Sequence, residues 1–344
     1  MKNKPKISIS IPVYNGGDLL KKSLEILYSS TNNKKFSHFY ELVISDNAST
    51  DNTREIINKY KKKLKRNNIQ VKYYRKNRNT GFYHNFIKTI KLATGEYILF
   101  MCDDDHPQGN FYKEIFKLFK TNNYKELCFL PIEKKKFKNK INLNVFGYAL
   151  TRGSITSGVI LKRKKISLKN IKYTLYPQTI IYLNYFFKYG MINLELKSKI
   201  KQIDIKKISD KLGHKGDRMN RKNDFAVLDK INIVEMFYNL KKINYLELSV
   251  AIYKIYTWCL NVKWKFHKEN EFIIEKNFFK EIQKYKRKSL MYVSLMLIIL
   301  INLFSEKRKF YLNTLRELFF KIWFKNLLIS DDNYLNSIII NIKL

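Results

Sequence analysis

Residues 96–105 read EYILFMCDDD, an almost continuous apolar run that ends abruptly in three consecutive aspartates. Continuous apolarity over a short segment is typical of a strand covered on both faces of a sheet, because such a strand has no side open to water. Three adjacent carboxylates beside the end of a buried strand are a costly concentration of like charge unless they bind a partner. This stretch therefore predicts a buried parallel sheet with a polar site at its edge.

The sequence around this stretch alternates between strand and helix signals. We expect strands at 7–12, 41–45, 70–74, 96–102 and 157–161, and helices at 19–29 with Asp18 as N-cap, 52–65, 82–93 and 176–189. This rhythm predicts an α/β fold, a mostly parallel sheet with right-handed crossovers and helices on both faces. Ligands of such sheets bind outside the carboxyl ends of the strands. The polar clusters at residues 14–15, 46 and 103–105 follow predicted strands and so fall at that edge.

The composition narrows the class of protein. The chain has 344 residues, 45% of them hydrophobic and 15% aromatic, and 67 Lys+Arg against 29 Asp+Glu give a net charge of +38. The apolar content excludes a disordered or collagen-like chain. Three cysteines without C-x-x-C spacing exclude a disulfide scaffold and a cysteine-rich zinc site.

The positive charge indicates an anionic partner, although a solvated lysine-coated surface is the alternative. The basic residues are mostly lysine, and the basic runs lack the interleaved aromatic residues that stack on bases, so we expect no specific nucleic acid. Attraction to an anionic membrane surface is the expectation that remains. Because the N-terminal residues do not resemble an export signal, we expect a cytoplasmic location, peripheral on the inner face of the plasma membrane.

A set of motifs in fixed order resembles a known family. Residues 11–15 (IPVYN), 43–51 (VISDNASTD), 79–82 (NTGF), 93–97 (ATGEY) and 103–105 (DDD) look like the family 2 glycosyltransferases with a GT-A fold. The group resembled is that of the abequosyltransferase- and rhamnosyltransferase-like enzymes of bacterial surface polysaccharides. The resemblance covers about residues 5–190. It implies a GT-A fold with a Rossmann-like, mostly parallel sheet, followed by a C-terminal helical region.

The resemblance also implies a nucleotide-sugar site. In it, Asp46 accepts the ring N–H of a pyrimidine base, although a turn or helix-capping role is the alternative. Tyr14 is expected to stack on the base, and a half-buried aromatic residue without a role in binding is the alternative. For Gly81, a turn residue with a positive φ is preferred over a contact with the donor. The expected nucleotide-sugar-binding residues are Pro12, Tyr14, Asn15, Asp46, Asn79, Gly81, Asn85, Asp103 and Asp104.

The three aspartates predict a metal site, with a solvated acidic turn as the alternative. Transfer from a nucleotide-sugar releases a nucleoside diphosphate, and a divalent cation held by carboxylates neutralises the charge of this leaving group. Because side chains alternate along an extended chain, Asp103 and Asp105 should face one side and Asp104 the other. We therefore expect Asp105 as the direct metal ligand with support from Asp103. Oxygen ligation indicates Mg²⁺ or Mn²⁺.

The catalytic base is the weakest part of the resemblance. Many inverting members of the family carry a Glu-Asp pair well after the three aspartates, and residues 150–230 contain none. Asp217, in the loop-like sequence GHKGDR, is our candidate for the base, because active-site residues favour such loops. The other candidates are Glu195, Asp204, Asp210, His214 and Asp224.

The chain is expected to contain a GT-A glycosyltransferase domain at residues 1–220 and a helical, membrane-associating region at 221–344. Residues 290–304 form an uncharged run of 15 residues flanked by basic clusters. This run is too short for a typical membrane span, which leaves a core helix or an interfacial helix as its alternatives.

These observations lead to one main functional hypothesis and two alternatives. The first is a metal-dependent, inverting glycosyltransferase that moves a sugar from a nucleotide-diphosphate donor to a glycan or lipid-linked acceptor of a bacterial surface polysaccharide. The second is a sugar-1-phosphate nucleotidyltransferase, which shares the fold. This alternative requires a Gly-rich loop with Arg and Lys after the first strand, and residues 12–18 lack that arrangement. The third is a non-enzymatic basic binding protein.

Overall fold

The computed structural model describes residues 5–32, 38–133, 146, 149–150, 155–168, 171, 174, 176–202, 223–244, 247–248 and 251. The chain divides into two units, Met1–Asn220 and Arg221–Leu344, and each is described by itself. That the first unit is a catalytic domain and the second associates with membranes stays a prediction.

The first unit is built on a seven-stranded sheet with the order β3-β2-β1-β4-β8-β6-β9. Strands β1, β2, β3 and β4 pair in parallel, as do β6 and β9, whereas β8 is antiparallel to both of its neighbours. The predicted α/β fold with a mostly parallel sheet is confirmed. The strands are β1 Ile7–Val13, β2 Tyr40–Asp46, β3 Gln70–Arg75, β4 Tyr97–Phe100, β6 Leu127–Phe129, β8 Val159–Lys162 and β9 Met191–Asn193.

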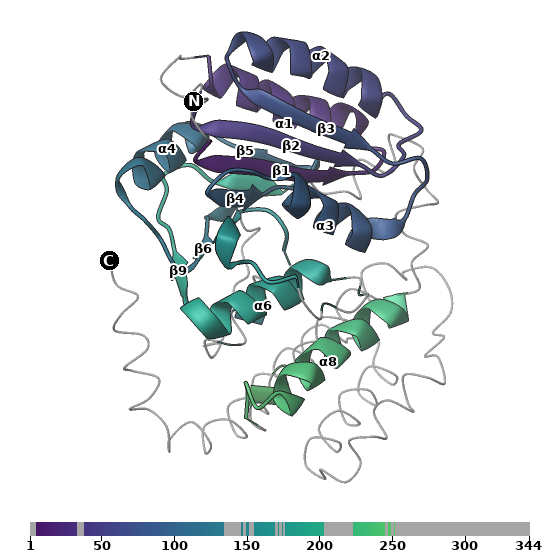
Figure 1. Cartoon of the computed structure of the whole chain (residues 1–344), viewed down its shortest axis with the longest axis vertical. Helices are drawn as coiled ribbons and strands as arrows, with labels where there is room; N and C mark the ends of the chain where they lie inside the picture. Colours follow the sequence, from purple (N-terminus) through teal and green to yellow (C-terminus); the bar gives the residue numbers. More distant parts are fainter. Residues whose placement is uncertain are drawn as a thin grey trace, which may run out of the picture. The chain divides into compact units, whose positions relative to one another are not determined.

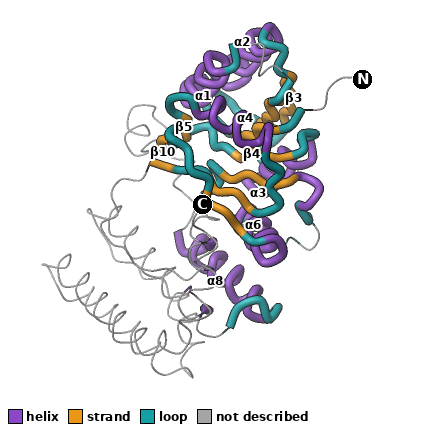
Figure 2. Tube along the Cα trace, turned by 90° about the vertical axis from the view of Figure 1, so that its left-hand side faces the viewer, coloured by secondary structure: helices purple, strands orange, loops and turns teal. Residues whose placement is uncertain are grey.

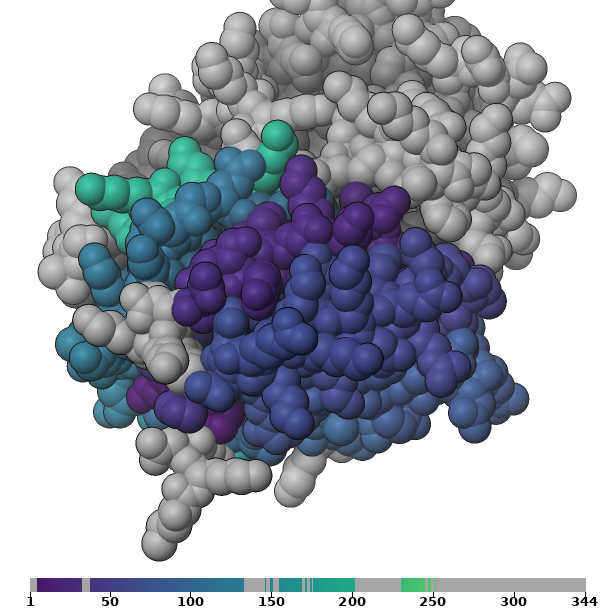
Figure 3. Space-filling model, turned by 90° about the horizontal axis from the view of Figure 1, so that it is seen from above, coloured from purple at the N-terminus to yellow at the C-terminus, as the bar shows by residue number. Residues whose placement is uncertain are grey.

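Helices cover both faces of this sheet (Figure 1). Helices α1 (Gly17–Ser30), α2 (Thr53–Arg66) and α4 (Phe111–Thr121) pack on one face, and α3 (Gly81–Leu92) and α6 (Pro177–Tyr189) on the other. In Figure 3 the surfaces of α1 (purple) and α2 (blue) lie side by side. Along β4, Leu99 joins the first core, while Ile98 and Phe100 join the second. Burial on both faces explains why this strand is apolar at every position.

The strand predicted at 96–102 ends earlier, at Phe100, because residues 103–104 form a turn. Asp105 then begins a second, three-stranded sheet with the order β5-β10-β7. Its strands are β5 Asp105–Pro107, β7 Ile132–Glu133 and β10 Ile200–Gln202. Strands β5 and β10 pair antiparallel and lie side by side in Figure 2.

The predicted N-cap of the first helix is wrong. Helix α1 begins at Gly17 with Gly16 as N-cap, so Asp18 lies within the first turn. The backbone N–H groups of Gly16 and Gly17 both donate to Oγ1 of Thr53, at 2.9 and 3.0 Å. A threonine at the start of α2 therefore accepts hydrogen bonds from backbone N–H groups at the N-terminus of α1. No local sequence pattern indicates this contact, because the two helices are distant in sequence.

Of the second unit, the structure describes helix α8 (Asn223–Asn239) and a few residues after it. The apolar run at 290–304 lies outside the described residues. Within the described part of the chain, no helix combines the length and the apolarity that a membrane span requires.

Candidate functional site

The loops that follow β1 and β2 are joined at the carboxyl edge of the sheet. The backbone N–H of Asn15 donates to Oγ of Ser49 at 2.9 Å, and that of Thr50 donates to Oδ1 of Asn15 at 2.8 Å. The N–H of Asn47 donates to the carbonyl of Val13 at 2.9 Å. Asn15 has a φ of 50°, a conformation that asparagine tolerates better than most residues. The polar residues expected at this edge are therefore held together by their own hydrogen bonds.

The loop after β3 joins the same network through the side chain of Asn47. Its Nδ2 donates to Oδ1 of Asn79 at 2.5 Å, and its Oδ1 accepts from the N–H of Thr80 at 3.0 Å. Gly81, the next residue, has a φ of 80°, so its predicted positive φ is confirmed. Asn79 thus lies on the rim of the site, where contact with a donor stays a prediction.

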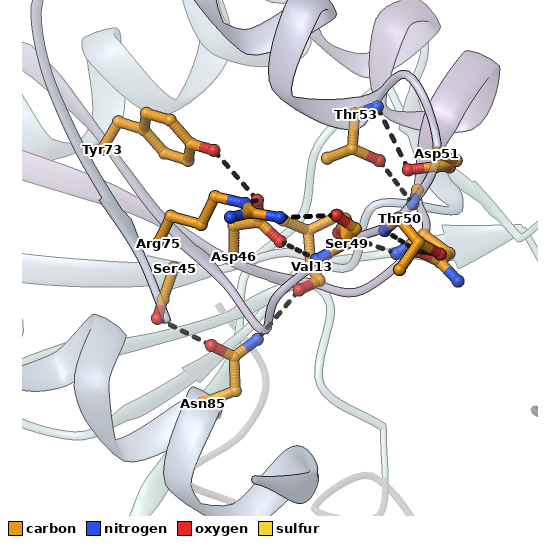
Figure 4. A network of polar contacts seen from close by, with 12 residues as sticks. Val13, Ser45, Asp46, Ser49, Thr50, Asp51, Thr53, Tyr73, Arg75 and Asn85 are labelled. Atoms are coloured by element: carbon orange, nitrogen blue, oxygen red, sulfur yellow. Dashed lines mark hydrogen bonds and ion pairs between the residues drawn. The ribbon is translucent and has the colours of Figure 1, made fainter. Parts of the chain in front are cut away.

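The side chain of Asn85, on α3, links the ends of β1 and β2. Its Oδ1 accepts from Oγ of Ser45 at 2.7 Å, and its Nδ2 donates to the carbonyl of Val13 at 3.1 Å (Figure 4). Both ends of this buried amide are engaged by the protein. Pro12 is likewise buried, within β1. For both residues the geometry favours positioning the edge of the sheet, and their direct contact with a donor stays a prediction.

Asp46 is fully buried at the end of β2. Its Oδ1 accepts from the backbone N–H of Ser49 at 2.8 Å, and its Oδ2 accepts from the hydroxyl of Tyr73 at 2.9 Å and lies 3.3 Å from Nε of Arg75 (Figure 4). Burial and the adjacent carboxylate raise the pKa of Tyr73, so this hydroxyl remains a donor. A base N–H would have to join these three donors or displace one of them.

The three aspartates lie beside the loop after β1. A Cβ atom on Gly16 would be 2.5 Å from Cγ2 of Val13 and 2.7 Å from Oδ2 of Asp103, so a side chain at position 16 would require both of these side chains to move. The ligand atoms of Cys102, Asp104 and Asp105 all lie within 4.8 Å of one another. Asp104 and Asp105 therefore do not lie on opposite sides, as the expected alternation required. Side-chain alternation does not apply here, because residues 103–104 form a turn rather than extended strand.

The electrostatics of this cluster favour a cation. The pKa of the Asp105 carboxyl is raised to about 7, chiefly by burial and also by the charges of Asp104 and Asp103, while a hydrogen bond with Ser157 opposes the shift. Burial also raises the pKa of the Cys102 thiol, so this group stays protonated and is a poor ligand. The donors that remain are the carboxylate oxygens of Asp104 and Asp105, which suit Mg²⁺ or Mn²⁺. The residues present therefore fit a hard divalent cation.

The candidates for a catalytic base are mostly not placed. Asp217, Asp204, Asp210 and His214 lie outside the described residues. Glu195 is exposed just after β9, and Asp224 lies within the first turn of α8. Asp217 as the base stays a prediction.

The structure adds side chains to the site that the sequence did not single out. Tyr73 and Arg75 reach Asp46 from β3, and the alternation of side chains along that strand, which gives residues 73 and 75 the same face, could have indicated them. Ser157 accepts from the backbone N–H of Cys102 at 2.7 Å and braces the turn that carries the aspartates. It comes from a distant part of the sequence, so no local signal could have found it.

Comparison with known proteins is consistent with this geometry. The model of the glycosyl transferase family 2 matches residues 8–191, more than half of the chain. A poly(ribitol-phosphate) beta-glucosyltransferase of Bacillus spizizenii is 41% identical over 101 residues, 29% of this chain and 15% of that protein. An abequosyltransferase of Salmonella typhimurium is 38% identical over 99 residues, 29% of this chain and 28% of that protein. The matched segments thus span less than a third of these relatives.

A solved structure shares the fold. Residues 1–349 of S. aureus TarS in complex with UDP-GlcNAc superpose with a TM-score of 0.52 at 16% identity, over 88% of this chain and 82% of that one. This likeness confirms the expected GT-A architecture.

Proposed function

Because the chain belongs to glycosyl transferase family 2, we propose that it is a metal-dependent glycosyltransferase that uses a nucleotide-diphosphate sugar as donor. The observation that carries this proposal is the pair Asp104 and Asp105, two adjacent carboxylates at the ligand-binding edge of a parallel sheet, with the pKa of Asp105 raised to about 7. The family membership favours sugar transfer over both alternative hypotheses.

In this proposal Asp105 holds Mg²⁺ or Mn²⁺, with Asp104 beside it, and Asp103 supports the metal or the ribose. The bound cation would neutralise the charge that develops on the departing diphosphate. The chain itself contributes the rest of the site: Asp46, with Tyr14, Asn15 and Asn79 around it, orients the nucleotide. The fixed hydrogen bonds of Asp46, Asn15 and Asn79 support this role, because a rigid site loses little entropy when the donor binds.

The acceptor and the stereochemistry belong to the same proposal. Inversion at the anomeric carbon requires a base to take the proton of the acceptor hydroxyl, and we assign this role to Asp217. We assign the acceptor to the glycans and lipid-linked intermediates of a bacterial surface polysaccharide. The name of the relative from Bacillus spizizenii, a poly(ribitol-phosphate) beta-glucosyltransferase, supports a polymeric acceptor. Action at the inner face of the plasma membrane is consistent with such acceptors.

Hydrolysis of UDP-, dTDP-, CDP- and GDP-sugars without an acceptor tests the proposal. At least one donor should release its nucleoside diphosphate, EDTA should stop the release, and added Mn²⁺ should restore it. Asp105→Ala should lower the rate at least about a hundred-fold. Glu55→Ala, which removes an exposed carboxylate from α2, is the control and should leave the rate unchanged. Full activity in EDTA would refute metal dependence, and no turnover of any donor would refute the function.

A further inference from the structure

A hollow of about 780 Å³ is lined by the end of the edge strand β3, the loop after it, and one face of α3. Its described lining includes Lys76, Arg78, Lys88 and Lys91, with Tyr74 on the strand side, and no carboxylate. On α3, positions 84, 88 and 91 all line the hollow, and their spacing of four and three residues places them on one helix face. We call this hollow the α3 groove.

Within the described part of the chain, no negative side chain neutralises the positive charges of the α3 groove. Among the described residues, none of these four cations forms an ion pair with a carboxylate. The Lys76 ammonium donates to Oγ1 of Thr80, and burial together with repulsion from Lys88 lowers the pKa of Lys76. The Lys88 ammonium lies 4.0 Å from the centre of the Tyr74 ring, against the wall of the groove. Like charges gathered in a hollow destabilise the protein unless an anion enters.

The charge and length of the groove indicate a ligand with several phosphates. A phosphate group carries at most about two negative charges, so four cations match two or more phosphates. The cations extend from the loop before α3 to its last turn, and ten residues of helix rise by about 15 Å. Arg78 and Lys91 are exposed, whereas Lys76 and Lys88 are half-buried inside the hollow, where a flat membrane surface would reach them less well than a narrow chain. The shape therefore favours a chain that lies along the groove.

We propose that the α3 groove binds a linear ligand with repeated phosphate groups, such as a phosphodiester-linked chain. One end of the groove includes Asn79 and Thr80, which the side chain of Asn47 ties to the candidate donor site. A phosphate-bearing acceptor held there would lead toward the carboxyl edge of the sheet. The role as an acceptor track rests on the proposed function, but the binding of phosphates does not.

Binding of linear inorganic polyphosphate to the full-length protein, measured by titration calorimetry, tests the proposal. The triple variant Lys76→Gln, Lys88→Gln, Lys91→Gln should bind at least about ten-fold more weakly, and its affinity should depend less steeply on salt. The matched control is Lys61→Gln, Lys62→Gln, Lys65→Gln, which removes the same number of charges from exposed positions of α2. The control should bind as the parent does.

Three other outcomes would overturn the proposal: unchanged binding in the groove variant, an equal loss in both variants, or a loss of binding to phosphatidylglycerol vesicles as large as the loss for polyphosphate. The first outcome would show that the groove is not the binding site. The second would show that binding depends only on the net charge of the protein. The third would show that the groove binds a membrane surface. The rate of donor hydrolysis by the groove variant distinguishes a failure of the groove proposal from a failure of the proposed glycosyltransferase function. A variant that hydrolyses donor like the parent shows that any failure concerns the groove alone.

Discussion

At the scale of single residues, Asp46 shows how a site can be prepared before its ligand binds. The carboxylate is fully buried, yet a backbone N–H, a tyrosine hydroxyl and a guanidinium all point at it. Hydrogen bonds to a buried charge are worth more than those between neutral groups. The same contacts fix the direction of the carboxylate at the edge of the sheet.

Asp46→Asn should raise the KM for the nucleotide-sugar about ten- to a hundred-fold and change kcat less, because base contacts are far from the reacting carbon. Initial rates over a range of donor concentrations give both constants. Tyr73→Phe, which removes one donor to the carboxylate and keeps its charge, is the control and should have a smaller effect. An unchanged KM for every donor that the parent uses would remove Asp46 from the site.

At the scale of elements, the sequence predicted most strands of the central sheet and four of its helices, but it missed helix α4 and the three-residue strand β5. Helix α2 and strands β1 and β2 follow from their own apolar periods, since each has enough residues to display one. Strand β5 has three residues, Asp105–Pro107, too few to show a period, and its partner β10 is distant in sequence. For this reason the three aspartates were expected at the right edge of the sheet, but Asp104 and Asp105 were wrongly expected on opposite sides.

The opposite, amino-terminal edge of the sheet holds another buried carboxylate. Oε1 of Glu41 accepts from Oγ of Ser8 at 2.5 Å, and its Oε2 accepts from Oγ1 of Thr94 at 2.8 Å and lies 2.9 Å from Nζ of Lys72. This network ties β1, β2 and β3 to the loop before β4. Burial alone raises the pKa of Glu41, but the hydrogen bonds from Lys72, Ser8 and Thr94 outweigh it, and the pKa is lowered.

A lowered folded-state pKa stabilises the protein above the unfolded value of about 4.3, and this contribution is lost as the pH falls through the folded-state value. Glu41→Gln should therefore lower the free energy of unfolding at pH 7 by about 1.5–3 kcal/mol. The difference from the parent should shrink below about pH 4. Urea unfolding at several pH values measures this. The exposed Glu55→Gln should show neither effect, and a difference independent of pH would contradict the assigned ion pair.

At the scale of the whole molecule, the family match explains the sugar-transfer part of the chain, whereas it does not explain the large positive charge. The match ends at residue 191, within the first unit. The net charge of +38 belongs to the complete chain, and the apolar run at 290–304 is flanked by basic clusters. Lipid-linked acceptors are confined to a membrane surface, so an enzyme that uses them gains by staying there. Electrostatic attraction to anionic lipid provides such a mechanism.

The full-length protein should co-sediment with phosphatidylglycerol vesicles and not with phosphatidylcholine vesicles. The attraction should weaken as salt rises, because the Debye length falls from about 10 Å at 0.1 M to about 3 Å at 1 M. Insertion of an apolar segment would behave differently, since burial of apolar surface does not require anionic lipid and is not weakened by screening. Salt-resistant binding to both kinds of vesicle would therefore replace the electrostatic explanation with an inserted helix. Failure to bind either kind would exclude membrane association as the reason for the charge.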